Sequence, residues 1–251
     1  MNQFIAEIRK IPPVTRFLCA SSLGVTIPTL MGVFSPYKII FEPQLVIRKF
    51  EVWRLYTSFF LGSRGLNYIF ELVMLYRTAD QLESGPFSRR LADFVWQLIL
   101  VGGSIILACL PIGGYVFARP LLVALVYLSS SLAPPGTQSS LMGLVTFPVI
   151  YLPYVMIGMD LLIAGPGAAA QAIAGAIVGH FWWWTMWAPD ERGRRPRLEW
   201  LGRAPRLFRL YIGEEGNGPR GGGGVEVIPP RRPTTGSSTG YNWGAGRRLG
   251  N

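Results

Sequence analysis

Residues 167–187 read GAAAQAIAGAIVGHFWWWTMW, an apolar run without a charged side chain. It has the length of about 20 residues that a helix needs to cross a membrane. Its small residues recur at helical spacing and share one face: Ala168, Ala172, Gly175 and Gly179. Small residues at such spacing let another helix approach closely. We therefore predict a spanning helix whose packing motif, Gly175 and Gly179, contacts another helix of this chain, with dimerisation as the alternative.

Charge is also sparse in the residues that precede this run. Half of the 251 residues are hydrophobic and 15% are charged, against about 25% in an average soluble domain. Between residues 91 and 187 the charged side chains are Asp93, Arg119 and Asp160 alone. A soluble domain needs charge over its whole surface, so this stretch is expected to face lipid. The net charge of +10 could indicate nucleic-acid binding, but basic cytosolic loops explain it better, and we expect no nucleic-acid partner.

Six apolar segments are expected to cross the membrane, which predicts an all-α polytopic membrane protein: 17–34, 66–82, 92–110, 116–132, 141–164 and 167–187. The second and fourth are shorter than about 20 residues. The second also carries Glu71, Arg77 and Asp80, so an amphipathic interfacial helix is its alternative. With six crossings both termini share one side with the basic loop between the second and third segments. The positive-inside rule makes that side the cytosol.

Three regions follow from these patterns: a six-helix membrane domain over 1–187, an amphipathic interfacial segment over 188–212 and a disordered cytosolic tail over 213–251. The tail is rich in Gly and Pro, a composition that cannot build a core. The loop over 36–65 mixes basic and aromatic residues, so we expect it to lie in the membrane interface. Within that loop Trp53 and Arg54 predict an interface motif, an indole at headgroup depth beside a guanidinium that pairs with lipid phosphate. Ordinary aromatic anchoring is the simpler interpretation.

Polar side chains in or next to the expected spans are candidates for function, because burying them in a membrane is costly. They are Asn67, Glu71, Gln81, Glu83, Asp160 and His180. Asp160 lies near the end of its segment, so an interfacial carboxylate is an equal interpretation. One histidine and two cysteines in apolar segments are too few ligands for an ordinary zinc site. We expect no metal and no cofactor.

The chain ends in a compact motif, WGAGRRLG at residues 243–250. Trp243 and Leu249 can fill apolar pockets of a partner, the glycines allow an extended backbone close to its surface, and the arginines can pair with acids. A low-complexity tail is the alternative. The residues of the candidate motif are Trp243, Gly244, Gly246, Arg247, Arg248, Leu249 and Gly250.

Several of these residues, in their order along the chain, resemble the Derlin family of rhomboid-like pseudoproteases. They are Trp53-Arg54, Tyr151-Leu152-Pro153-Tyr154 and Gly175 with Gly179-His180, joined by Asn67, Glu71 and Gln81-Leu82-Glu83. The resemblance covers roughly residues 5–212 and implies a rhomboid-like fold in the endoplasmic reticulum membrane. The terminal motif resembles the SHP box, which binds the AAA+ ATPase valosin-containing protein.

What the resemblance implies is a non-catalytic component of endoplasmic-reticulum-associated degradation. Such a protein engages misfolded proteins and aids their retrotranslocation through a locally thinned membrane. The implied partners are valosin-containing protein, a membrane ubiquitin ligase complex, misfolded client proteins, the lipid bilayer and further Derlin chains in a homo- or hetero-oligomer.

The same comparison predicts that catalytic residues are missing. A rhomboid protease needs a serine near the start of the fourth span and a histidine three residues before the first glycine of the packing motif. Here that histidine position is Ala172, and no serine lies between Ser104 and Ser129. A hydroxyl is a poor nucleophile without an imidazole within reach. Two alternatives stay open: a protease with a rearranged site, joining His180 or Asp160 to a serine at 129–131, and a small-molecule transporter, which would have an internal repeat and a charged midplane site.

Overall fold

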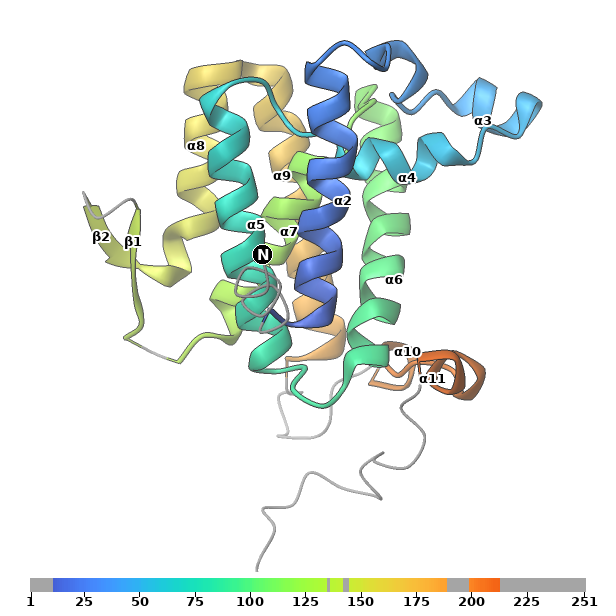
Figure 1. Ribbon diagram of the computed structural model, residues 1–251. Helices are drawn as coiled ribbons and strands as arrows, with labels where there is room; N and C mark the ends of the chain where they lie inside the picture. Colours follow the sequence, from blue (N-terminus) through green and yellow to red (C-terminus); the bar gives the residue numbers. More distant parts are fainter. Residues whose placement is uncertain (1–10, 135, 142–144, 189–198, 213–251) are drawn as a thin grey trace, which may run out of the picture. The chain divides into compact units, whose positions relative to one another are not determined.

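The computed structural model describes residues 11–134, 136–141, 145–188 and 199–212 (Figure 1). The chain separates into two units, Met1–Asn217 and Gly218–Asn251. The second unit lies outside the described residues, and so does every residue of the predicted terminal motif.

The described residues of the first unit form six long helices, and each overlaps one of the six apolar segments. They are α2 (Pro13–Leu30), α5 (Leu66–Ser84), α6 (Leu91–Cys109), α7 (Ala118–Leu132), α8 (Leu152–Ala164) and α9 (Pro166–Met186). Within the described part of the chain, length and apolar character qualify one helical stretch as a membrane span, Leu91–Ile112, in which the short 3-10 helix η2 (Leu110–Ile112) continues α6. The stretches Ala118–Leu132 and Val149–Ala164 are also apolar but shorter.

Helix α7 is the innermost of the six, and its residues are buried on all sides from Pro120 to Val126. Helix α9 packs against it through two glycines. A Cβ at Gly175 would lie 2.7 Å from Pro120 Cα, and one at Gly179 would lie 2.9 Å from the carbonyl oxygen of Ala124. Real Cβ atoms do not come so close to backbone. Glycine is therefore required at both places, and the surface it meets belongs to the same chain.

The prediction for the fifth segment was wrong over its first residues. Residues 138–141 and 145–148 form two antiparallel strands, β1 (Gln138–Leu141) and β2 (Val145–Pro148), in which Gln138 pairs with Pro148. The 3-10 helix η3 (Val149–Tyr151) follows, and α8 starts only at Leu152. Proline is disfavoured inside a helix but accepted in its first turn, so Pro148 falls outside α8 and Pro153 inside its start. The expectation that the second segment is short was also wrong, because α5 has 19 residues while α7 has 15 and α8 has 13.

Short helices lie at both ends of the long ones (Figure 1). The loop between α2 and α5 contains the 3-10 helix η1 (Pro36–Lys38), α3 (Pro43–Lys49) and α4 (Trp53–Phe60). At the opposite end, where α6 begins, α10 (Glu199–Gly202) and α11 (Arg206–Ile212) follow α9. The expected surface segments thus contain short helices, and the loop 61–65 joins α4 to α5.

Candidate functional site

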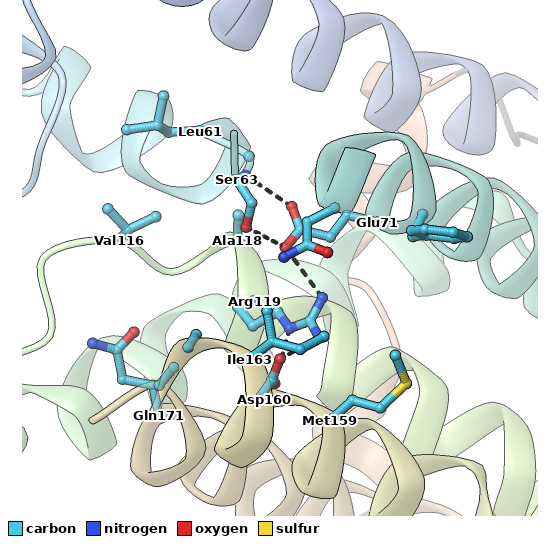
Figure 2. A pocket seen from close by; sticks show the side chains of 15 residues that line it. Leu61, Ser63, Glu71, Val116, Ala118, Arg119, Met159, Asp160, Ile163 and Gln171 are labelled. Atoms are coloured by element: carbon cyan, nitrogen blue, oxygen red, sulfur yellow. Dashed lines mark hydrogen bonds and ion pairs between the residues drawn. The ribbon is translucent and has the colours of Figure 1, made fainter. Parts of the chain in front are cut away.

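A cavity of about 330 Å³ lies between α5, α7 and α8, beside the loop before α5 and the start of α9 (Figure 2). Its walls are largely apolar, supplied by Leu61, Phe70, Val116, Met159 and Ile163. Its polar lining comes from Ser63, Asn67, Glu71, Arg119, Asp160 and Gln171. An apolar hollow with a few polar groups is the usual form of a binding site. We call it the charged cavity below.

Arg119 of α7 joins two carboxylates that come from different helices. Its Nε donates to Asp160 Oδ2 at 2.9 Å and its Nη2 to Asp160 Oδ1, while its Nη1 donates to Glu71 Oε1 at 3.1 Å. Figure 2 shows the guanidinium between the two acids. The side chains of Arg119, Glu71 and Asp160 are 25%, 11% and 7% exposed. Two-pronged arginine–carboxylate pairs are among the stronger polar contacts in proteins, and buried charges require such partners.

Glu71 also fixes the loop that precedes α5. Its Oε2 accepts from the backbone N–H of Ser63 at 2.9 Å, and its Oε1 accepts from the Ser63 hydroxyl at 2.6 Å. One residue earlier, the Gly62 N–H donates to the Thr26 hydroxyl of α2 at 2.9 Å. The loop at the mouth of the charged cavity is thus tied to both α2 and α5.

The structure brings three of the predicted polar residues together and separates the other three. Asn67, Glu71 and Asp160 line the charged cavity. Glu83 is near the end of α5, and its carboxylate contacts the start of α2 instead. It accepts hydrogen bonds from the backbone N–H groups of Val14 at 3.0 Å and Thr15 at 2.8 Å and from the Thr15 hydroxyl at 2.8 Å. The first N–H groups of a helix have no partner within it and attract negative charge. Glu83 is therefore the cap of α2.

His180 and Gln81 contact α7 near its C-terminal end, away from Arg119. His180 Nδ1 and the Tyr127 hydroxyl are 2.7 Å apart, and Gln81 Oε1 accepts from the Ser129 hydroxyl at 3.0 Å. The Ser130 hydroxyl donates to the Tyr127 carbonyl at 2.8 Å. A rearranged protease would need an imidazole or carboxylate on one of these serines. In the structure the His180 imidazole is hydrogen-bonded to Tyr127 instead, and the Asp160 carboxylate is paired with Arg119.

The expected contact of Arg54 with lipid phosphate was wrong. Arg54 is 6% exposed. Its guanidinium pairs with Glu51 and donates to the carbonyl oxygens of Tyr37 at 2.7 Å and Ile40 at 3.0 Å. Of the two residues of the predicted motif, Trp53 is the exposed one. Arg54 therefore holds the loop between α2 and α4 together, because its guanidinium joins backbone carbonyls of that loop to α4.

Arg119 is the functional candidate that the sequence reasoning missed. It was counted among three charges in a long apolar stretch and was given no role. The signal was present, since acids at 71 and 160 inside apolar segments each require a cation, and Arg119 is the one basic residue between 91 and 187. Sequence spacing alone could not show that α5, α7 and α8 bring the three side chains to one place.

The segment after α9 is bound to the first turns of α6 by side chains that the sequence did not indicate. Asp93 Oδ1 accepts from the Ala204 N–H at 2.8 Å and from Arg209 Nη2 at 2.9 Å. Gln97 Nε2 donates to the Gly202 carbonyl at 2.9 Å, and its Oε1 accepts from the Trp182 indole at 2.8 Å. Helices α10 and α11 are thus fixed to α6. Their outer side exposes aromatic and aliphatic side chains: Trp200, Leu207, Leu210 and Tyr211.

Comparisons of the sequence with known proteins identify its relatives. Residues 11–196 match the model of the Der1-like family. Derlin-1 of Arabidopsis thaliana is 33% identical over 227 residues, which cover 88% of this chain and 83% of the relative. Derlin-1 of Mus musculus is 28% identical over 252 residues, with 96% of each chain covered. Derlin-2 of Oryza sativa subsp. japonica is 27% identical over 259 residues, which cover 98% of this chain and 97% of the relative.

Proposed function

The chain belongs to the Der1-like family, the Derlins, and from this premise we propose that it is a non-catalytic component of endoplasmic-reticulum-associated degradation. It engages misfolded proteins at the endoplasmic reticulum membrane and assists their transfer to the cytosol. The observation that carries the proposal is the charged cavity between the helices, in which the charged lining groups pair with one another. Arg119, Glu71 and Asp160 form an ion-pair network there in place of a nucleophile and a base. A site of this kind can bind polypeptide, but it has no group poised to cleave it.

Helix length supports transfer through a locally thin bilayer. At 1.5 Å per residue, the 13 residues of α8 are about 20 Å long, and Leu161, Leu162 and Ile163 of this helix are exposed. The hydrocarbon core of a typical bilayer is about 30 Å thick. A short helix draws headgroups inward at a modest cost per Å. The barrier to moving a polar polypeptide across the membrane is lower where the apolar layer is thinner.

The tail recruits the soluble machinery under this proposal. The motif at residues 243–250 resembles an SHP box and would bind valosin-containing protein, while the membrane domain would associate with a ubiquitin ligase complex and with other Derlin chains. Basic residues support a cytosolic location for the end of the membrane domain at which α2 and α6 begin. Arg16 lies in the first turn of α2, Arg90 directly precedes α6, and Arg203 is next to Ala204, which is hydrogen-bonded to Asp93 of α6.

One purification tests the central claim. The full-length protein and a variant without its last ten residues are purified in mild detergent, and bound proteins are identified. We expect the ligase complex and clients with both chains and the ATPase only with the full chain. Equal recovery of the ATPase would contradict the role of the tail, and absence of ligase and clients from both would contradict the proposed function. Labelling with a fluorophosphonate tests the protease alternative, which requires a reactive serine.

A further inference from the structure

The charged cavity contains one negative charge more than it can neutralise itself. Its titratable lining residues are Glu71, Asp160 and Arg119. When ionised these are two negative charges and one positive charge, a balance of −1. Every one of the terminal nitrogens of Arg119, and its Nε, already faces a carboxylate. A net charge among apolar walls is unfavourable because it lies outside bulk water. The cavity is therefore suited to a cation and unsuited to an anion.

Acceptor capacity for such a cation is present. Glu71 Oε2 accepts one hydrogen bond, from the Ser63 N–H, although each carboxylate oxygen can accept two. The amides of Asn67 and Gln171 line the same space. An ammonium brings three donors and a guanidinium five. The polar groups of the cavity can receive several of them.

The apolar walls of the cavity favour a ligand that also has an aliphatic part. Leu61, Phe70, Val116 and Ile163 surround the polar lining with apolar surface. Lys and Arg side chains combine an aliphatic stem with a charged head, and the cavity of about 330 Å³ is far larger than a bare ion. Among the described residues no cluster of three or more metal-ligating side chains is present, which disfavours a divalent metal.

We infer that the charged cavity binds a Lys or Arg side chain of a client polypeptide, which deepens the proposed function by naming the substrate class. A client with a basic residue in an otherwise apolar span has an unpaired charge in the membrane, at high cost. Pairing it with Glu71 removes both uncompensated charges together. A lipid ammonium fits less well, because it carries a phosphate close by and Arg119 is the one basic residue lining the cavity, already held by two acids.

The experiment uses the full chain in bilayer nanodiscs and a fluorescent single-span peptide with one central guest residue. Guests are Lys, Arg, norleucine and Glu, and the dissociation constant is measured by energy transfer to the protein. We expect Lys and Arg peptides to bind about tenfold more tightly than norleucine, as for a charge-assisted hydrogen bond. The Glu peptide is expected to bind more weakly than norleucine.

Variants give effects of opposite sign, which a merely structural role would not. Glu71→Gln makes the cavity neutral and should reduce the Lys preference to within about twofold. Arg119→Gln leaves two uncompensated acids and should increase it. Asp80→Asn removes a carboxylate from the same helix outside the cavity and should leave the preference unchanged. Thermal unfolding identifies any variant that fails to fold. If Arg119→Gln fails to fold, the loss of the Lys preference in Glu71→Gln still tests the inference.

The possible failures are distinct. Equal binding of Lys and norleucine peptides to the wild type overturns the inference and leaves client engagement intact. Absence of binding by all four peptides overturns the inference and the engagement step of the proposed function together. A Lys preference in phosphatidylglycerol nanodiscs that disappears in phosphatidylethanolamine nanodiscs assigns the cavity to a lipid ammonium and also overturns it.

Discussion

Replacing Gly175 by alanine tests the contact between α7 and α9 with a single methyl group. The added Cβ would lie 2.7 Å from Pro120 Cα and 2.9 Å from Pro120 C. Both atoms are backbone, so relief requires a shift of one helix against the other. Such overpacking costs about 1–3 kcal/mol. We expect Gly175→Ala to lower the free energy of unfolding by this amount.

Gly103→Ala is the matched control, because a Cβ there in α6 meets no atom within 4 Å. Alanine favours helix over glycine by about 0.5–1 kcal/mol, so the control should be neutral or slightly stabilised. Both glycines lie inside helices, so the propensity gain is common to the two variants and they should differ by the overpacking cost, about 1–3 kcal/mol. Unfolding in mixed micelles with increasing dodecyl sulfate, followed by tryptophan fluorescence, measures the difference.

Equal stability of Gly175→Ala and Gly103→Ala would refute the packing argument. Protein concentration separates the two interpretations of the small-residue face. A contact within the chain predicts a loss of stability that does not change on dilution. A loss that appears only at high protein concentration would show that the glycines form a dimer contact.

Three further predictions concern other parts of the chain. Glu83→Leu should destabilise the protein by about 2–5 kcal/mol, because three buried donors at the start of α2 lose their acceptor, and Glu83→Gln should cost less in the same dodecyl sulfate titration. Asp93→Ala should speed tryptic cleavage in α11, since that side chain holds the segment after α9; an unchanged cleavage rate would contradict this. A peptide covering 239–251 should bind the N-terminal domain of valosin-containing protein in a fluorescence polarisation assay, with loss of binding on Leu249→Ala and full binding by a longer tail carrying Glu226→Ala.

Apolar length and charge spacing located the six helices, because burial from water depends on composition over many residues. The start of α8 was misplaced since an apolar run at 141–151 fits an extended hairpin as well as a helix. Among the charged residues of the charged cavity, Glu71 and Asp160 could be predicted as functional candidates because acids are costly in a membrane, whereas Arg119 was not predicted. Pairing depends on which helices are neighbours, and a single sequence does not contain that information directly. Arg54 was misjudged for a similar reason, as its carbonyl partners are 14 and 17 residues away.

The cap that Glu83 places on α2 has a consequence for biosynthesis. The two N–H groups at Val14 and Thr15 find their acceptor 69 and 68 residues later in the chain. Until the ribosome has made the end of α5, the first turn of α2 lacks its partner, and unsatisfied N–H groups are most costly away from water. We therefore expect α2 to remain near the bilayer surface during translation and to settle into the membrane together with α5, so that this antiparallel pair, and not the first helix alone, is the earliest stable intermediate of insertion.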